Sequence, residues 1–312
     1  MSPSMRRAVE RARAFAGTSL PILLVGPTGT GKEVLAQAIH RWSGRRGALV
    51  DVDCGTLSAG TVINELFGHR RGSYTGAVDS VPGLMELAHG GTLFLDELGS
   101  MPPEGQAVLL RALETGELRR VGETTKRRVS VRVMAAMQHL PRAGADPITR
   151  ADLLQRLGGG IIQLLPLCHR PEEVMPLAQR FAAEQGRWLR AEAGAVLLAY
   201  DWPGNVRELR HVIARALTLQ PEGAVEAASV AEAVDAGAVL EGPAPRGAAD
   251  SERARASFLD LCRAHGGRAA AIGAAIGVSR ATVYRRLQQL GIRLDEMRPD
   301  AEGGGGARLT LS

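Results

Sequence analysis

A glycine-rich segment, Gly26-Pro-Thr-Gly-Thr-Gly31-Lys32, has the residue types and spacing that bind phosphate. It follows the apolar run PILLV and precedes the helical pattern EVLAQAIH, so it joins a predicted strand to the start of a helix. Glycines let backbone N–H groups surround an anion, and Lys32 can reach the outer phosphates. An accidental glycine turn is disfavoured by the flanking strand and helix. The predicted nucleotide-binding residues of this loop are Gly26, Pro27, Thr28, Gly29, Thr30, Gly31, Lys32 and Glu33.

A pair of carboxylates, Asp96-Glu97, follows a second apolar run, TLFL. In an ATPase the Asp would hold magnesium with its bound water, and the Glu would polarise the attacking water. Such a pair alone is typical of a capped turn, but behind a phosphate loop it favours hydrolysis. Glu33 stands where phosphate loops usually carry the Ser or Thr that contacts magnesium, so metal binding must depend on other residues. The predicted cofactors are ATP and Mg²⁺, with Asp96 as the metal residue.

The elements that position these residues follow an alternating pattern. From Leu20 onward short apolar runs alternate with helical patterns, which predicts an α/β fold with a parallel sheet covered on both faces. After Pro166 the strand signals stop, and EEVMPLAQRFAAEQ, AEAGAVLLAY and VRELRHVIARALTL all have helical spacing. The sequence therefore predicts a P-loop ATPase core followed by a small helical lid subdomain.

The C-terminal part concentrates positive charge. Between Arg263 and Arg293 there are six arginines and no acidic residue, which is typical of a surface that faces nucleic-acid phosphates. Two helical patterns separated by Gly277 predict an all-α helix-turn-helix, whose second helix can enter the major groove. A basic hairpin packed on its own chain is the alternative. The candidate DNA contacts are Ser279, Arg280, Thr282, Tyr284, Arg285 and Arg286.

These patterns give five segments. We predict an α/β ATPase subdomain over 1–166, a helical lid over 167–236, a Gly/Ala/Pro-rich linker over 237–250, a helix-turn-helix domain over 251–294 and a disordered tail over 295–312. About 20 residues precede the first strand, so we expect no receiver or sensory domain before it, with control supplied by another protein, by expression level or by a domain outside this sequence.

Composition is compatible with this organisation. The 312 residues are 45% hydrophobic, enough for a core, and the net charge of +5 would suit an anionic partner. No apolar run of about 18 residues or signal-peptide pattern occurs, so we expect a cytoplasmic protein without a membrane partner. The three cysteines, Cys54, Cys168 and Cys262, are odd in number and far apart, which suits neither a disulfide framework nor a metal site.

Over about residues 5 to 292 the chain resembles the AAA+ ATPase activators of bacterial sigma-54 RNA polymerase. GPTGTGKE is similar to the family's GETGTGKE, and NELFGHRRGSYTGA is similar to its ELFGHEKGAFTGA. GGTLFLDEL, RADLLQRL and WPGNVREL are similar to further signatures of the family. The segment GGRAAAIGAAIGVSRATVYRRLQQLGI resembles the Fis-type helix-turn-helix that ends many of these activators.

The resemblance implies roles for particular residues. Arg150 and Arg156 would reach into a neighbouring subunit's nucleotide site, where a permanently charged guanidinium suits a transferring phosphoryl group. Arg207 would report the nucleotide state to the helical lid. The loop that touches the sigma factor would comprise Gly72, Ser73, Tyr74, Thr75, Gly76 and Ala77. From the residues alone, Tyr74 could instead fold back on its own domain, and the arginine pair could be a solvated helix face.

Two positions depart from the family pattern. Asp53 stands where the family usually has the Asn whose amide holds the catalytic Glu inactive until nucleotide is sensed, and an ionised Asp cannot donate that bond. Two nearby carboxylates would repel, or one would take up a proton. Met137-Gln138 stands where the family's sensor segment has Thr-Asn. We therefore expect ATP binding with slower or differently regulated hydrolysis.

Taken together, the sequence predicts a homo-oligomer, expected to be a hexamer, that binds upstream enhancer-like DNA and uses ATP to remodel the promoter complex of sigma-54 RNA polymerase. One alternative is a DNA-binding regulator that uses ATP only to assemble. Another is an AAA+ machine for a different substrate, which the Tyr74 loop and the DNA-binding end disfavour.

Overall fold

The computed structural model describes residues 1–74, 77–141, 149–241, 248–276 and 280–292. The chain divides into two compact units. The first is Pro3–Leu165, and the second is Pro166–Ser312 together with Met1–Ser2.

The first unit is built on a five-stranded parallel sheet. Its strands, in spatial order, are β2 (Leu49–Asp53), β5 (Thr92–Asp96), β8 (Arg132–Met137), β1 (Ile22–Val25) and β9 (Gly160–Gln163). Each neighbouring pair is parallel. The residues of β1 and β8 are all buried, as expected for strands covered on both faces. The predicted parallel-sheet core is confirmed.

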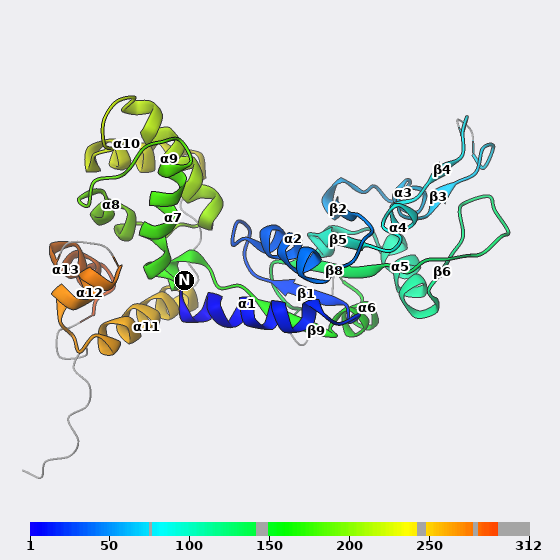
Figure 1. The fold of residues 1–312 in the computed structure, drawn as a ribbon, viewed down its shortest axis with the longest axis horizontal. Coiled ribbons are helices and arrows are strands. Elements are labelled where there is room, and N and C mark those ends of the chain that lie inside the picture. Colours follow the sequence, from blue (N-terminus) through cyan, green and yellow to red (C-terminus); the bar gives the residue numbers. More distant parts are fainter. Residues whose placement is uncertain (75–76, 142–148, 242–247, 277–279, 293–312) are drawn as a thin grey trace, which may run out of the picture. The chain divides into compact units, whose positions relative to one another are not determined.

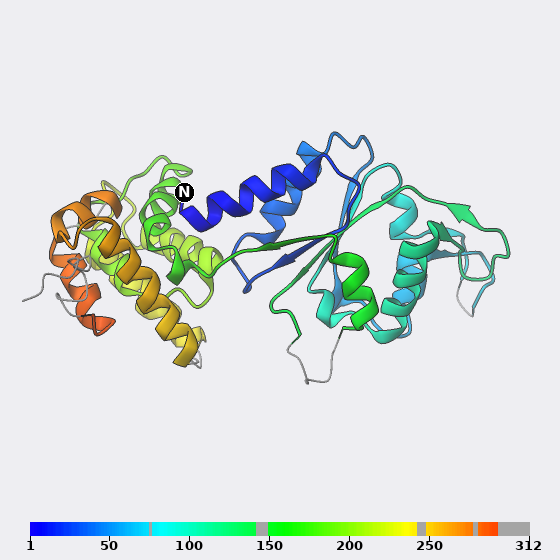
Figure 2. The same ribbon diagram turned by 90° about the horizontal axis from the view of Figure 1, so that it is seen from below.

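Alternate residues of the central strands β5, β8 and β1 face two separate cores. On β1, Leu23 and Val25 belong to one apolar cluster, whereas Ile22 and Leu24 belong to the other. Helices cover both faces of the sheet (Figures 1 and 2). One face carries α1 (Pro3–Ala16) and α2 (Lys32–Trp42), and the other carries α3 (Val62–Phe67), α5 (Pro103–Thr115) and α6 (Ala151–Leu157).

Two short hairpins project from the same end of this unit (Figure 1). In one, β3 (Gly68–His69) pairs with β4 (Val81–Pro82), and in the other, β6 (Glu117–Leu118) pairs with β7 (Arg127–Arg128). A bridge between His69 and Val121 joins the two hairpins. The remaining short elements of the unit are η1 (Cys54–Thr56), α4 (Leu84–Leu87) and η2 (Leu98–Ser100).

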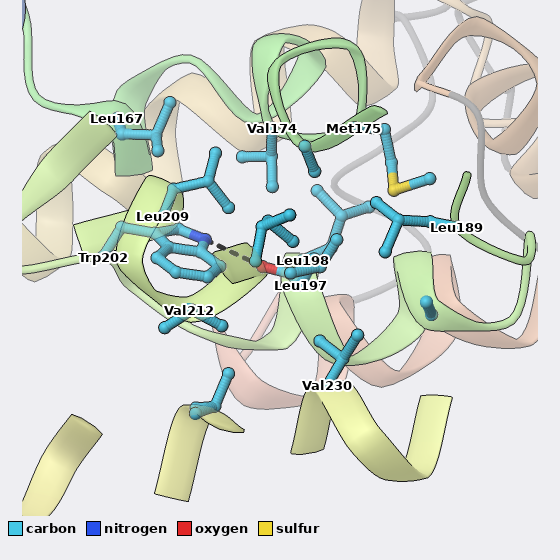
Figure 3. Packing of buried hydrophobic residues seen from close by; sticks show 14 of the residues in the cluster. Leu167, Val174, Met175, Leu189, Leu197, Leu198, Trp202, Leu209, Val212 and Val230 are labelled. Carbon is cyan, nitrogen blue, oxygen red and sulfur yellow. Dashed lines mark hydrogen bonds between the residues drawn. The ribbon is translucent and has the colours of Figure 1, made fainter. Parts of the chain in front are cut away.

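The second unit is helical around Trp202. Its indole Nε1 donates a 2.8 Å hydrogen bond to the Leu197 carbonyl, and Leu209 and Val212 pack beside the ring (Figure 3). Because the N–H has a partner, the large ring can be buried completely. The elements of this unit are η3 (Leu167–His169), α7 (Pro171–Ala183), α8 (Ala193–Ala199), α9 (Asn205–Leu219), α10 (Ala227–Glu241), α11 (Ala248–Ala264), α12 (Ala269–Ile276) and α13 (Arg280–Gln289). The predicted helical lid is confirmed.

The last three helices share the core of the lid. Phe258 and Val283 are buried in the same apolar cluster as Leu197 of α8. Helix also occupies both ends of the predicted linker 237–250, since α10 continues to Glu241 and α11 begins at Ala248. The alanines there favour helix more than the sequence interpretation allowed. Residues 242–247 and the predicted tail 295–312 lie outside the described residues.

Candidate nucleotide site and Tyr74 loop

The phosphate loop joins β1 to α2, as predicted. Gly31 is the N-cap of α2 and has a φ of 101°, a conformation that favours glycine. The Lys32 ammonium donates to the carbonyls of Gly26 at 2.7 Å and of Pro27 at 3.1 Å, so it lies over the loop. The Thr30 hydroxyl also donates to the Pro27 carbonyl. The loop thus surrounds its lysine beside the N-terminus of α2, where an anion is stabilised.

Asp96 and Glu97 lie at the carboxyl end of β5, two strands from β1. Asp96 Oδ1 accepts a 2.9 Å hydrogen bond from the Glu97 N–H. Glu97 has a φ of 50°, a left-handed conformation that residues with a side chain rarely adopt. Strained backbone of this kind clusters at functional sites, so the geometry favours a specific role for the Glu97 carboxylate.

Negative charge gathers around Asp96. The pKa of Asp51 is raised, first by burial and then by the charges of Glu33 and Asp96. The pKa of the Cys54 thiol is raised to about 12, first by burial and then by Asp53 and Asp96, so this cysteine is not a reactive thiolate. A cation would relieve the mutual repulsion of these carboxylates.

The residues present fit magnesium bound mainly through phosphate. Among the described residues no group of three or more His, Cys, Asp and Glu side chains could hold a metal ion alone. Mg²⁺ characteristically takes one or two carboxylates and completes its shell with phosphate oxygens and water. The Asp96 carboxylate, at the carboxyl end of β5 in the same parallel sheet as β1, is the donor of the right chemistry.

The two predicted switch segments lie at the same sheet edge as the site. Asp53 is the register partner of Asp96 on the neighbouring strand, and its Oδ1 accepts a 2.9 Å hydrogen bond from the Gly55 N–H. Met137 ends β8, is buried, and accepts a 3.1 Å hydrogen bond from the Gly26 N–H. Gln138, the next residue, is exposed. The switch positions are thus placed beside both the carboxylates and the phosphate loop.

Arg150 and Arg156 are exposed at the two ends of α6. The Arg150 guanidinium bonds Asp152 at 2.8 and 3.1 Å, and Arg156 Nη2 donates to the Leu113 carbonyl at 3.2 Å. Both side chains are accessible to a neighbouring molecule. Arg207, the predicted sensor, is exposed on α9 of the second unit.

Gln106 is a residue that the sequence interpretation missed. It is buried on α5, donates to the Met101 carbonyl at 2.9 Å and accepts from the Arg150 N–H at 2.8 Å. Met101 caps η2, the short helix that begins beside Glu97. Gln106 therefore connects the backbone at the start of α6 to the segment that follows Asp96 and Glu97. Its position in phase with buried Leu109 of α5 was an available signal.

The Tyr74 loop lies between β3 and β4. The Tyr74 side chain is 46% exposed and meets His69 edge to face, with ring centroids 5.2 Å apart. The Gly72 N–H donates to the carbonyl of Ala77, which is itself buried. Thr75 and Gly76 lie outside the described residues. Tyr74 is therefore not enclosed in the core of its own domain.

The second hairpin supports this loop. Arg70 N–H donates to the Val121 carbonyl, and Val121 N–H donates to the Gly68 carbonyl. Gly122 has a φ of 78°, and a side chain there would bring its Cβ within 2.6 Å of Ser73 Cβ. Gly122 thus packs directly against Ser73, and this steric contact couples the second hairpin to the Tyr74 loop.

Helix α13 carries the predicted DNA contacts in different environments. Arg280 and Tyr284 are exposed, and the guanidinium lies 5.5 Å from the tyrosine ring centre. Thr282 and Arg285 also lie on α13, whereas Ser279 is outside the described residues.

Arg286 differs from the prediction. Its side chain is only 6% exposed, and its Nη2 donates to Asp201 Oδ1 at 3.0 Å. Its Nη1 lies 3.4 Å from the Ala199 carbonyl at the end of α8. The structure thus gives Arg286 an intramolecular partner in place of DNA, because burial against the lid leaves its guanidinium no phosphate-facing side.

Residues 1–163 match the family model of the sigma-54 interaction domain. The chain belongs to the sigma-54 interaction domain family. Residues 169–244 match the AAA+ ATPase lid domain, so the resemblance and the ATPase class inferred from the motifs are both confirmed. None of the described helices has the length and apolarity to cross a membrane.

Curated relatives share most of this chain. It is 40% identical to the alginate biosynthesis transcriptional regulatory protein AlgB of Pseudomonas putida, over 92% of this chain and 66% of AlgB. It is 41% identical to the nitric oxide reductase transcription regulator NorR1 of Cupriavidus necator, over 93% of this chain and 63% of NorR1. The chain thus spans about two thirds of the length of these relatives.

Solved structures with the same fold include a nucleotide complex. NtrX from Brucella abortus in complex with ATP has a TM-score of 0.69 and 30% identity, covering 94% of this chain and 69% of that chain. A mutant of RuvB from Thermotoga maritima has a TM-score of 0.53 at 19% identity, covering 92% of this chain and 86% of that chain, which shows a shared fold alone.

Proposed function

We propose that this protein binds ATP and Mg²⁺, assembles into a ring, and uses hydrolysis to drive the Tyr74 loop against the sigma-54 promoter complex. The observation that carries this proposal is the exposed Tyr74 ring, held on a hairpin that is braced by a second hairpin of the ATPase unit. Solvent-exposed aromatic rings with a neighbouring polar group are typical of interface contacts.

In the nucleotide site, Lys32 would exchange its bonds to the Gly26 and Pro27 carbonyls for the outer phosphates of ATP. Asp96 would hold the metal, which when bound neutralises charge on the phosphate oxygens. Glu97 would orient and deprotonate the attacking water, and its strained, left-handed backbone supports a functional role at this position.

Oligomerisation would complete each site. Arg150 and Arg156 are exposed at the ends of α6 and would supply positive charge to the phosphoryl group in the neighbouring subunit. Gln106 would transmit the position of Arg150 to the segment beside Glu97. A hexamer is the assembly we propose, with Arg207 of the lid sensing the nucleotide.

Binding to upstream DNA would use the helix-turn-helix formed by α12 and α13. Exposed Arg280 and Tyr284 are the side chains on α13 that support this role. They are at the N-terminal half of the helix, which is the part that contacts base edges in such motifs.

Promoter opening in a reconstituted sigma-54 system tests the proposal. We expect ATP-dependent open complexes with the parent protein and their loss in Tyr74→Ala, with ATP turnover retained. Tyr74→Phe keeps the ring and should retain opening. Trp42→Ala removes a comparably exposed ring from α2 and is the matched control. Equal opening by Tyr74→Ala and the parent would refute the role of the loop.

The alternative function is a regulator that binds DNA and uses ATP only to assemble. Asp53 favours it, because an ionised carboxylate at this position accepts from Gly55 and cannot donate to the catalytic Glu. Phosphate release separates the two functions. We expect Asp53→Asn to change turnover measurably while ATP affinity stays unchanged; identical turnover would show that Asp53 does not control hydrolysis, and no turnover in either protein would favour the assembly regulator.

A further inference from the structure

We propose that the arginines beside the Tyr74 loop bind the sugar-phosphate backbone of the promoter DNA that is being opened. These loop arginines are Arg70, Arg71 and Arg119. The inference rests on the proposed function, since it assigns a second partner to the loop that would meet the sigma factor. It differs from the proposed upstream DNA contact, which would use α13.

The loop arginines carry uncompensated charge. All three side chains are exposed, and within the described part of the chain none of them forms an ion pair with a carboxylate. The hydrogen bonds of Arg70 and Arg71 within the described residues are made by the backbone: the two N–H groups donate to the Val121 carbonyl and the Ser80 hydroxyl, and the Arg70 carbonyl accepts from the Ser73 N–H. Their guanidinium groups are thus available to an anion.

Neighbouring basic residues of the same hairpins are used differently. Arg120 bonds both oxygens of Glu86 at 2.7 Å, and both side chains are only 15% exposed. The other pairs are Arg127 with Glu123 at 3.1 Å and Lys126 with Glu117 at 2.8 Å. Acidic residues of this region are therefore already paired with the bracing cations, apart from exposed Asp79, and the loop arginines set the sign of the surface.

The backbone brings the three arginines into one region. Val121 is bonded to Gly68 and to Arg70, so the segment that carries Arg119 runs beside the segment that carries Arg70 and Arg71. Both hairpins project from the end of the unit away from α1 (Figure 1). The Tyr74 ring lies in the same loop as Arg70 and Arg71, four and three residues further along.

This combination fits nucleic acid with unpaired bases. A guanidinium fork matches phosphate oxygens, and release of counterions makes each such contact favourable. An exposed aromatic ring among basic groups gives an unstacked base a surface to stack on. An acidic segment of a partner protein would use the charge but would not need a ring among glycines. We therefore favour DNA with a melted stretch over a protein partner.

The test compares two variants of equal charge. The first is Arg70→Ala, Arg71→Ala and Arg119→Ala in the full chain with ATP. The matched control is Arg6→Ala, Arg7→Ala and Arg11→Ala, which removes three exposed arginines from α1 of the same unit. The probe is a fluorescent duplex with a central unpaired bubble and no upstream site, and its affinity is measured across a salt series.

We expect the loop variant to lower the affinity and to reduce the slope of log K against log salt by about 2 to 3, since each lost phosphate contact removes ~0.7–0.9. The control should keep the parent slope, and ATP turnover should be unchanged in both. Fully paired duplex should show a smaller loss than the bubble probe. Replacing the loop arginines by Lys should restore the slope, because the charge is retained.

Three outcomes would overturn the inference. The first is an unchanged salt slope in the loop variant, and the second is an equal loss of DNA affinity in the α1 control. The third is a loop variant that no longer binds isolated sigma factor in the absence of DNA. The last would assign the loop arginines to a protein partner. None of these outcomes touches the proposed function, which depends on Tyr74→Ala in promoter opening. A defect of Tyr74→Ala with intact DNA binding would support the proposed function and separate the two.

Discussion

Arginines serve opposite purposes at the Tyr74 loop and on α13. At the loop, Arg70, Arg71 and Arg119 extend into solvent with no carboxylate partner among the described residues. On α13, Arg286 is 6% exposed and pairs with Asp201 of the lid. The sequence analysis predicted that Arg286 contacts DNA, because the C-terminal stretch has arginines without acids. Local charge density is thus a poor guide to which cations are free.

The difference comes from where the nearest carboxylate lies in the fold. Asp201 is 85 residues from Arg286 in the chain, so the acid-free stretch around Arg286 says nothing about its partner. Around the loop the acids are nearby in sequence, but apart from exposed Asp79 they pair with other cations, such as Arg120 and Lys126. A buried guanidinium is destabilising unless polar or charged groups of the protein compensate it, whereas a guanidinium on an exposed loop is solvated by water.

The largest effect is expected for Arg286→Ala. Removing the guanidinium breaks its ion pair with Asp201 and its packing at the contact of α13 with α8, so we expect the second unit to lose about 2 to 3 kcal/mol of unfolding free energy. Asp201 is partly exposed, which keeps the loss below that of a fully buried pair. Urea unfolding measures this loss. It is followed by the fluorescence of Trp202, which is buried in the apolar cluster that residues of α8 and α13 also form.

Arg280→Ala is the matched control on the same helix. Its side chain is exposed, and its partner among the residues that the structure describes is Tyr284, so its removal should change stability by less than about 0.5 kcal/mol. Equal urea midpoints for Arg286→Ala and Arg280→Ala would contradict the contrast between the two regions. Promoter-independent DNA binding should fall in Arg280→Ala and not in Arg286→Ala if only Arg280 faces DNA.

Sequence reasoning succeeded where the chemistry is local. The phosphate loop needs glycines, a lysine and a flanking strand and helix within one short segment, and β1, Gly31 and Lys32 have the predicted places. The alternation of strands and helices predicted the sheet, because burial on both faces requires continuous apolar strands such as β1. Asp53 and Asp96 became neighbours because parallel strands end at one edge.

It failed where a contact joins distant segments. Glu86 and Arg120 are 34 residues apart, and no periodicity connects them. Gln106 and Arg150 are 44 residues apart, and their bond depends on how α5 packs beside α6. The linker over 237–250 was predicted from its Gly and Pro content, although helix extends into it from both sides. Pairings of this kind are fixed by tertiary packing.

Arg119 and Arg120 are adjacent, but one is exposed and the other is paired with Glu86, so they allow the same comparison inside one loop. The expected effect on local stability is intermediate in size. Arg120→Ala removes a bidentate, charge-assisted pair with Glu86, so we expect local opening of the hairpins to become easier by about 1 to 2 kcal/mol. Arg119→Ala should leave the opening unchanged. Amide exchange at Val121 and Arg70, whose N–H groups join the hairpins, should accelerate roughly 5- to 30-fold in the first variant only. Equal exchange in both would show that the pair does not brace the loop.

The smallest effect is a pH dependence of the same brace. The hydrogen bond from Arg120, aided by its charge and that of Arg127, holds the pKa of Glu86 below its ordinary value. A carboxyl with a depressed folded pKa stabilises the folded hairpins above its ordinary pKa of 4.5, and this contribution is lost as the pH falls from there through the lower folded pKa. Exchange at Val121, corrected for intrinsic rates, should therefore accelerate in acid below the ordinary pKa of Glu in the parent and show no such step in Glu86→Gln. Glu117 is the control: Lys126 and Arg128 also lower its pKa, but these partners belong to the same hairpin as Glu117 and do not join the two hairpins, so Glu117→Gln should keep the parent step. A step that survives in Glu86→Gln would assign the titration to another carboxylate, and the Arg120–Glu86 pair would then not be the pH-sensitive brace of the two hairpins.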